Sequence, residues 1–308
     1  MENNQPLPPS TSYSEIIADI GRSLKDRQKD LFKRILLISW PVIVLSVAVY
    51  LYSISSWKLS ELPQGINPVM WILLGVAIIA LVFLYYSVVS FVFAIEKHLW
   101  IRSFFRNQQL NSKESWRIAW GLFGAIVELG IRVFLRYYLF LLIVIPFAII
   151  LFYQFAPAVG MDASSYAKEY MIFYGILVVG TLAYLAVIAL KLRFAFFLFL
   201  DKRDTDSPFT YSTFFRDMNA LNKIAGSDSI KKVLVADIGA GTVRSITTFA
   251  IRQFSGGIQS LGSAAGVFGA ALRPFGEESV RQFTSFARLT AVYVLYDKAK
   301  LSLDNSAQ

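Results

Sequence analysis

The sequence predicts an all-α integral membrane protein, a helical bundle with about four transmembrane helices and with amphipathic helices at the cytoplasmic interface. Hydrophobic residues make up 56% of the 308 residues and charged residues only 17%, whereas soluble proteins carry about 25% charged residues. The apolar residues are concentrated in long blocks, and the basic residues fall almost entirely between alternate blocks. Composition, block length and charge distribution therefore all indicate a membrane protein.

Four blocks are long enough to cross a bilayer. A hydrocarbon core about 30 Å thick requires about 20 apolar residues in a helix. The predicted spans are 35–54, 68–95, 137–155 and 171–190, and none of them contains Asp, Glu, Lys, Arg or His. The first thirty residues lack the apolar core of a signal peptide, so the first span is expected to act as its own insertion signal.

The basic residues predict the orientation, because short loops rich in Lys and Arg stay in the cytoplasm. Of the 30 basic residues, 28 lie before the first span, between the second and third spans, or after the fourth, and only Lys58 and Lys168 lie in the other connections. We therefore expect a multi-pass protein of the cytoplasmic (inner) membrane with both termini in the cytoplasm. The net charge of +9 follows this topology, so membrane lipids with anionic headgroups are the expected partners, and nucleic acid is not.

The spans divide the chain into three predicted parts. These are a cytoplasmic N-terminal segment (1–34), a four-span membrane domain (35–200) and a cytoplasmic or interfacial helical region (201–308). The last part contains three helical patterns and a segment rich in Gly, Ala and Ser, 256–276. From sequence, this segment is a loop, a half-inserted hairpin or a fifth membrane contact.

The pattern of apolar and charged residues in 112–135 predicts an amphipathic helix within the membrane domain. Apolar residues recur at helical spacing, charged residues interrupt them, and Ser112 is the predicted N-cap. Such a helix is expected to lie in the interface and not to cross the bilayer.

Six charged residues near the predicted cytoplasmic interface are candidate contacts for lipid headgroups or for a partner protein. They are Arg117, Glu128, Arg132, Arg136, Lys191 and Arg193. Glu128 and Arg132 stand four residues apart and are expected to pair on one face of a helix. Long basic side chains near the ends of spans reach the headgroup level, so the helix of the fourth span is expected to continue obliquely at the membrane surface beyond Lys191 and Arg193. A ligand or ion site at Glu128 and Arg132 is the alternative to a surface pair.

Two motifs suggest a cofactor or a metal but lack the required context. Residues 232–242 look like the glycine-rich first motif of an S-adenosylmethionine-dependent methyltransferase, but the 66 residues that follow are mostly helical in pattern and do not alternate strands with helices. Asp201, Asp204 and Asp206 alternate as in a calcium loop, without its glycine and distal glutamate. With no cysteine and one histidine, His98, we predict no catalytic residue, cofactor or metal.

The order of spans and amphipathic helices resembles that of YciC-like proteins and of the membrane domain attached to some glycerophosphodiester phosphodiesterases. The segments that carry the resemblance are 112–120 and 207–216, within residues 30–225. The acidic-glycine turn common before the second helix is only partly present, at 201–206. The resemblance implies an α-helical membrane domain and no activity, because the catalytic phosphodiesterase domain has no counterpart.

The expected function is that of a non-enzymatic membrane protein that organises lipid or a partner protein, with a homo-oligomer as another form of the partner. Spans without ionisable residues disfavour an ion-coupled transporter. Two alternatives stay open. One is the membrane component of a transport system, and the other is a lipid-modifying enzyme that uses interfacial carboxylates such as Glu96, Glu128 or Asp201.

Overall fold

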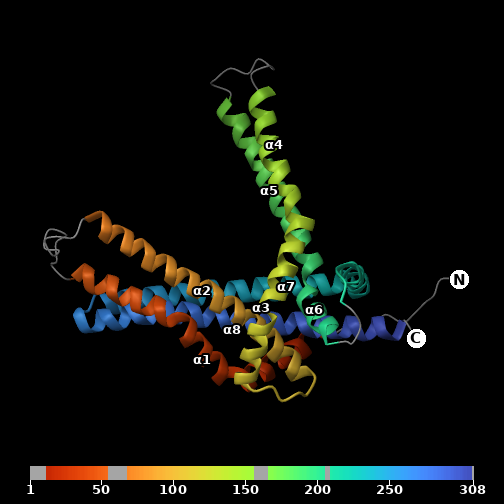
Figure 1. Ribbon diagram of the computed structural model, residues 1–308, viewed down its shortest axis with the longest axis horizontal. Helices are drawn as coiled ribbons and strands as arrows, with labels where there is room; N and C mark the ends of the chain where they lie inside the picture. Colours follow the sequence, from red (N-terminus) through yellow and green to blue (C-terminus); the bar gives the residue numbers. More distant parts are fainter. Residues whose placement is uncertain (1–11, 55–67, 156–165, 205–208, 307–308) are drawn as a thin grey trace. The chain divides into compact units, whose positions relative to one another are not determined.

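The predicted all-α class is confirmed by the computed structural model, which describes residues 12–54, 68–155, 166–204 and 209–306 (Figure 1). Every regular element among these residues is a helix. Five helical stretches in the described residues are long and apolar enough to cross a membrane. Four of them overlap the predicted spans, and the fifth is the helix that begins at Tyr211.

The first two predicted spans are the apolar ends of longer helices. Helix α1 covers Tyr13–Ile54 and α2 covers Pro68–Phe105. Both helices continue into polar sequence, which the apolar blocks alone do not predict. Packing of one helix on another stabilises such extensions more than helix propensity does.

Three elements then follow without a loop: α3 (Ser112–Val133), the π-helix η2 (Phe134–Tyr138) and α4 (Leu139–Phe155). The N-cap prediction was wrong by one residue, because Ser112 is already the first helical residue. The side chain of Asn111 accepts a hydrogen bond from the backbone N–H of Glu114 at 2.8 Å, the usual geometry of a capping residue. The predicted interfacial helix therefore leads directly into the third predicted span.

The fourth span lies in α5 (Tyr166–Leu192), which ends just before a short helix, α6 (Ala195–Arg203). The sequence predicted that this region continues obliquely along the membrane surface. Instead, Phe197, Phe199 and Leu200 of α6 are each no more than 2% exposed. These side chains pack inside the protein and do not form a lipid-facing surface.

The C-terminal region consists of two long helices, α7 (Tyr211–Gln259) and α8 (Ser263–Ser306). Gly226, with φ 62° and ψ −170°, interrupts α7, and its positive φ favours glycine. The segment 256–276 is helical on both sides of a short turn that contains Gly262, at φ 123°. Of the three possibilities for this segment, a plain loop is therefore excluded, and the half-inserted hairpin and the fifth membrane contact remain.

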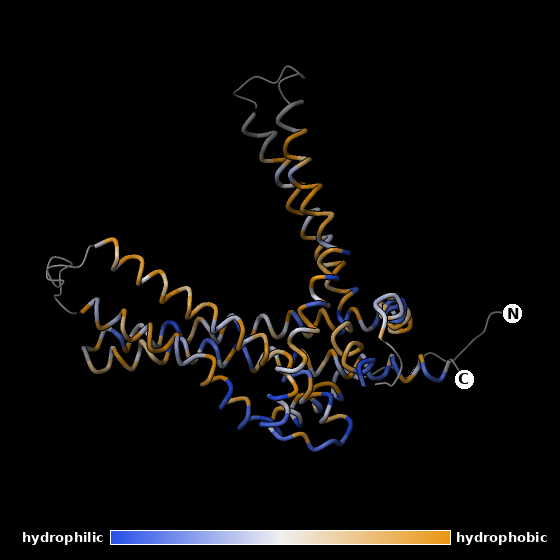
Figure 2. Tube along the Cα trace, in the orientation of Figure 1, coloured by the Kyte–Doolittle hydropathy of each residue, from blue (hydrophilic) through white to orange (hydrophobic). Residues whose placement is uncertain are grey.

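The chain forms two compact units. The first comprises residues 1–120 and 224–308, and the second comprises residues 121–223. Segments distant in sequence thus share a unit, unlike the consecutive parts expected from the order of the spans. Figure 2 shows apolar ends on α1 and α2 in the first unit and on α4 and α5 in the second.

In the first unit, α1 and α8 run antiparallel along most of their length. Near one end, Ser23 Oγ and Thr290 Oγ1 lie 3.3 Å apart. Near the other end, the hydroxyl of Tyr50 is 3.4 Å from the carbonyl oxygen of Gly262. Helix α2 joins this pair through side chains such as Lys97, which contacts α8.

Candidate functional site

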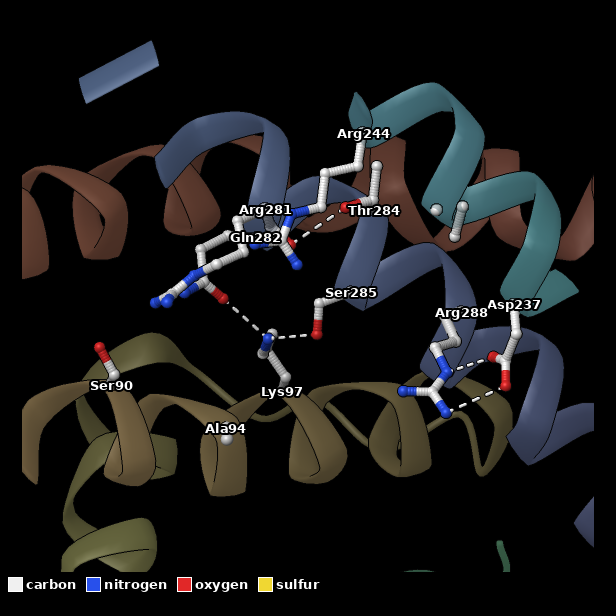
Figure 3. A pocket seen from close by; sticks show the side chains of 12 residues that line it. Ser90, Ala94, Lys97, Asp237, Arg244, Arg281, Gln282, Thr284, Ser285 and Arg288 are labelled. Atoms are coloured by element: carbon white, nitrogen blue, oxygen red, sulfur yellow. Dashed lines mark hydrogen bonds and ion pairs between the residues drawn. The ribbon is translucent and has the colours of Figure 1, made fainter. Parts of the chain in front are cut away.

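A cavity of about 500 Å³ opens in the first unit between α2, α7 and α8 (Figure 3). We call it the basic cavity. Its lining residues are Ser90, Ala94, Lys97, Asp237, Ala240, Gly241, Arg244, Arg281, Gln282, Thr284, Ser285 and Arg288.

Helical spacing explains why these side chains share one space. On α8, Arg281 and Arg288 stand seven residues apart, two turns along one face, and Asp237 and Arg244 have the same spacing on α7. Gly241 adds no side chain between them. Each helix therefore presents a polar stripe to the other, and α2 closes the third side.

Glycines bring α7 and α8 together near their turn. A Cβ at Gly269 would lie 2.8 Å from the backbone oxygen of Ser255, and one at Gly276 would lie 3.1 Å from the side chain of Ile251. Such distances are too short for any larger residue without a shift of its neighbours. Farther from the turn, an ion pair between the long side chain of Arg288 and Asp237 joins the two helices, and the basic cavity opens there.

Lys97 is the most buried cation of the basic cavity, with 3% of its surface exposed. Its ammonium group donates hydrogen bonds to Gln282 Oε1 and to Ser285 Oγ, both at 2.8 Å (Figure 3). Both partners are neutral. Burial, together with the nearby charge of Arg281, lowers the pKa of Lys97 to about 7, so its charge is only partly present at neutral pH.

The remaining cations differ in how far they are neutralised. Arg281 pairs with Glu278 at 2.9 Å, and Glu278 also accepts a hydrogen bond from the hydroxyl of Tyr86 at 2.8 Å. Arg288 pairs with Asp237. Arg244 is exposed and has no hydrogen bond or ion pair in the described part of the chain.

The lining carries three arginines, one carboxylate and the partly protonated Lys97, so its net charge at neutral pH lies between two and three positive units. Guanidinium groups bind phosphate and carboxylate oxygens through paired N–H donors, and an ammonium group adds a point charge. The arrangement is suited to an anion with several oxygens.

The basic cavity overlaps the polar end of the second predicted span, 68–95, because Ser90 and Ala94 line it. On α1 and α2, Trp40 Nε1 donates to the hydroxyl of Tyr85 at 3.2 Å, and Tyr86 is the next residue. Trp and Tyr favour the headgroup level of a bilayer. The predicted span 68–95 is longer than the roughly 20 residues that a bilayer core requires, so we place the edge of the core near Tyr85 and Tyr86 and call these three residues the aromatic belt. The guanidinium of Arg281 lies 5.1 Å from the centre of the Tyr86 ring.

A second polar cluster, centred on Glu96, ties α1 to α2 and to the start of α3. Arg34 donates two hydrogen bonds to the carboxylate of Glu96, at 2.8 and 3.0 Å. Ser115 Oγ donates to the same carboxylate at 2.7 Å and accepts from the indole N–H of Trp100 at 2.8 Å. Glu96 is fully buried, and these partners satisfy its charge. The cluster holds α1, α2 and the start of α3 together, and we call it the clasp.

Five of the six charged residues predicted from sequence lie in the second unit, and Arg117 lies on the exposed face of α3 in the first. Arg132 pairs with Glu128 at 3.0 Å, as their spacing predicts, and Arg136 lies 4.4 Å from the ring centre of Phe215. Lys191 is exposed. Their role as lipid or partner contacts stays a prediction.

Arg193 differs from the other five. Its Nε and one terminal nitrogen are buried and have no hydrogen-bond partner in the described part of the chain. Its guanidinium lies 4.8 Å from the ring centre of Phe194. Arg193 thus keeps donors available at the end of α5.

The structure does not form the methyltransferase-like or the calcium-loop-like motif that the sequence suggested. Residues 232–242 are helical throughout, as part of α7, so the strand and glycine loop of a methyltransferase do not form there. Asp201 is a buried residue of α6, whereas Asp206 lies outside the described residues. Among the described residues, no three His, Asp or Glu side chains form a cluster suited to a metal ion.

Sequence reasoning missed the basic cavity. Its cations are dispersed over almost 200 residues, from Lys97 to Arg288. In the sequence, each of them looks like an ordinary charged residue at the membrane interface. The available signal was the matching seven-residue spacing of Asp237 with Arg244 and of Arg281 with Arg288. That spacing predicts a charged stripe on each helix but not that the two stripes face each other.

A scan against protein-family models and searches of curated proteins and of solved structures find no match to this chain. The resemblance to YciC-like proteins therefore stays a prediction. The helices themselves define the class: with several helices long and apolar enough to cross a bilayer, this is an α-helical membrane protein.

Proposed function

We propose that this chain is a non-enzymatic multi-pass protein of the cytoplasmic (inner) membrane, with both termini in the cytoplasm, that organises lipid. In this proposal, the basic cavity holds the phosphate of an anionic lipid headgroup. The observation that carries the proposal is the excess of cations in this cavity, in particular the unpartnered guanidinium of Arg244.

The position of the basic cavity supports a headgroup as its ligand. Arg244 and Arg281 also line a neighbouring cavity of about 360 Å³ that borders Ser39 and Tyr86. These two arginines therefore lie close to the aromatic belt, at the level where lipid phosphates are found. The distribution of basic residues along the sequence places this level on the cytoplasmic side.

The fate of the interfacial carboxylates supports a non-enzymatic role. A general base or nucleophile needs access to its substrate. Glu96 is fully buried and bound by Arg34 and Ser115. Glu278 is 6% exposed and bound by Tyr86 and Arg281. Both carboxylates hold helices together, whereas Glu128 is exposed and pairs with Arg132 on the surface of one helix.

The test is a titration of the purified full chain in mild detergent with phosphatidylglycerol, followed by native mass spectrometry. Arg244→Gln removes one cation without breaking an ion pair, so it should weaken lipid binding by about tenfold, the effect of losing one charge-assisted hydrogen bond. Phosphatidylcholine, which carries no net charge, should bind weakly to both proteins. Binding of phosphatidylglycerol should also weaken at higher salt.

Lys231→Gln is the matched control, because Lys231 is exposed on the same helix and outside the basic cavity. It should bind phosphatidylglycerol as the wild type does. Equal loss in both variants would show a nonspecific charge effect and overturn the proposal. Inorganic phosphate in a parallel titration distinguishes the sources: binding as tight as that of the lipid would replace the headgroup with a soluble anion.

A further inference from the structure

The turn between α7 and α8 lies beside the apolar part of α1. The hydroxyl of Tyr50 is 3.3 Å from the carbonyl oxygen of Gln259 and 3.4 Å from that of Gly262. A Cβ at Gly266 would lie only 1.6 Å from the Tyr50 hydroxyl, so any larger residue there would require the Tyr50 ring to move. Tyr50 belongs to the first predicted span and is ten residues beyond Trp40 of the aromatic belt.

The distance from the belt to the turn follows from α8. Glu278 of α8 is hydrogen bonded to Tyr86 of the belt, and Gly266 touches Tyr50. Glu278 and Gly266 are twelve positions apart, which corresponds to about 18 Å of helix. The turn therefore lies more than halfway across a hydrocarbon core about 30 Å thick, if α1 crosses it.

The hairpin loses its charged residues on the apolar side of the aromatic belt. Residues 253–272 contain no Asp, Glu, Lys, Arg or His, and their outward side chains include Phe254 (64% exposed), Leu261 (76%) and Phe268 (60%). Large apolar side chains this exposed are unfavourable in water and favourable among acyl chains.

The charged residues at the base of the hairpin pair with one another and leave one net positive charge. Glu277 pairs with Arg252 at 2.8 Å and with Arg273 at 3.2 Å. Long arginine side chains also extend toward the headgroups while their stems stay in apolar surroundings. The base is thus compatible with the edge of the bilayer.

The backbone of the turn also meets the requirement of a lipid environment, where polar groups need partners within the protein. Ser260 N–H donates to the Gly256 carbonyl at 3.2 Å, and Leu261 N–H donates to that of Ile258 at 3.1 Å. The hydroxyl of Tyr50 donates toward the carbonyl oxygens of Gln259 and Gly262.

From these observations we infer that residues 253–272 form a re-entrant hairpin, which enters the bilayer beside α1 and turns back inside it. Its partner is the acyl-chain region of the lipid. Helix α7 is long and apolar enough to cross a membrane, but α8 returns to the side from which α7 came. Both ends of the hairpin therefore stay on the side of the aromatic belt.

The test is the depth of nitroxide spin labels in the full chain, reconstituted in vesicles of phosphatidylcholine and phosphatidylglycerol. The chain contains no cysteine, so each single variant carries one label. Phe268→Cys on α8 and Phe254→Cys on α7 place the label on outward faces of the two arms. Both labels should collide often with dissolved oxygen and rarely with a water-soluble nickel chelate.

Two references calibrate the result. Val44→Cys, on the exposed face of α1 in the first span, reports the lipid value, and Lys231→Cys, exposed on α7 outside the hairpin, reports the aqueous value. Labels at 254 and 268 that match Val44→Cys support the re-entrant hairpin. Labels that match Lys231→Cys overturn it. The result does not depend on whether the basic cavity binds lipid.

Discussion

The two units of this protein hold their helices together by different means. In the first unit, buried charges are matched by directed hydrogen bonds, as between Arg34 and Glu96. In the second, the interior of α6 and the start of α7 is aromatic: Phe197 and Phe214 are at most 1% exposed. Its ion pairs lie at the rim, such as that between Lys202 and Asp217, whose side chains are 26% and 25% exposed.

This difference shows which interactions fix the arrangement of the helices in each unit. A buried ion pair penalises any arrangement that separates its partners, because an unpaired buried charge is costly. An aromatic interior contributes burial and ring contacts, such as that of Phe214 with Phe215 at 5.2 Å between ring centres, and tolerates changes of similar shape. We therefore expect the first unit to be sensitive to charge and the second to volume.

The largest effect is expected at the buried pair of the first unit. Arg34→Met leaves the carboxylate of Glu96, which is fully buried, without its guanidinium. The free energy of unfolding should fall by about 3–5 kcal/mol, measured by denaturant titration in mild detergent with tryptophan fluorescence. The double variant Arg34→Met, Glu96→Met should regain part of the loss, since no buried charge is left unpaired.

Arg22→Met on the same helix is the control. Its side chain is 71% exposed and pairs with Asp19 at the surface, so the expected change is within about 0.5 kcal/mol. If Arg34→Met were as stable as this control, the buried pair would not distinguish the two units.

A smaller effect is expected in the aromatic interior of the second unit. Phe214→Leu removes ring contacts at a fully buried position but keeps an apolar side chain. The free energy of unfolding should fall by about 1–2 kcal/mol, measured in the same way. Phe249→Leu, at a site that is 63% exposed on α7, should change it little. A loss as large as that of Arg34→Met would show that this interior is no more tolerant than the clasp.

The smallest effect is expected at the surface ion pair of Glu277, and it should depend on pH. The guanidinium of Arg252, which donates to Glu277 at 2.8 Å, holds the pKa of that carboxyl below its usual range, against an opposing effect of burial. A carboxyl with a lowered pKa stabilises the folded state above its unfolded pKa, and this stability is lost as the pH falls through the folded pKa.

Wild type should therefore exceed Glu277→Gln in free energy of unfolding by less than about 1 kcal/mol at pH 7. The difference should shrink as the pH falls from about 5 to 3, because Gln does not titrate. Unfolding curves of both proteins across this range make the comparison. A difference that stays constant with pH would contradict the assignment of the pair.

Several elements were predictable because their signals are local. The four spans follow from block length and hydropathy, and each lies in an observed helix. The pairing of Glu128 with Arg132 follows from a spacing of four residues within one helix. The N-cap of α3 was displaced by one residue, since Asn111 and Ser112 are both good capping residues.

Other features had no local signal. The region after the fourth span was predicted to continue obliquely at the membrane surface because Lys191 and Arg193 can extend to the interface, whereas packing within the second unit buries the aromatic residues of α6. The hairpin of α7 and α8 depends on Gly266 and Gly269, because a glycine at these positions leaves room for a close neighbour. That neighbour is Tyr50 for Gly266 and Ser255 for Gly269. Sequence spacing alone does not reveal either neighbour.

The sequence by itself determined the class, the apolar blocks and the distribution of basic residues, because hydropathy and charge are properties of each residue summed over short windows. Only the tertiary structure decided that Lys97, Arg244 and Arg281 share one cavity, and that the turn of the last hairpin lies beside Tyr50. The physical reason is that both features come from contacts between helices far apart in the chain. Those contacts depend on how side chains pack, and no single helix specifies its neighbours.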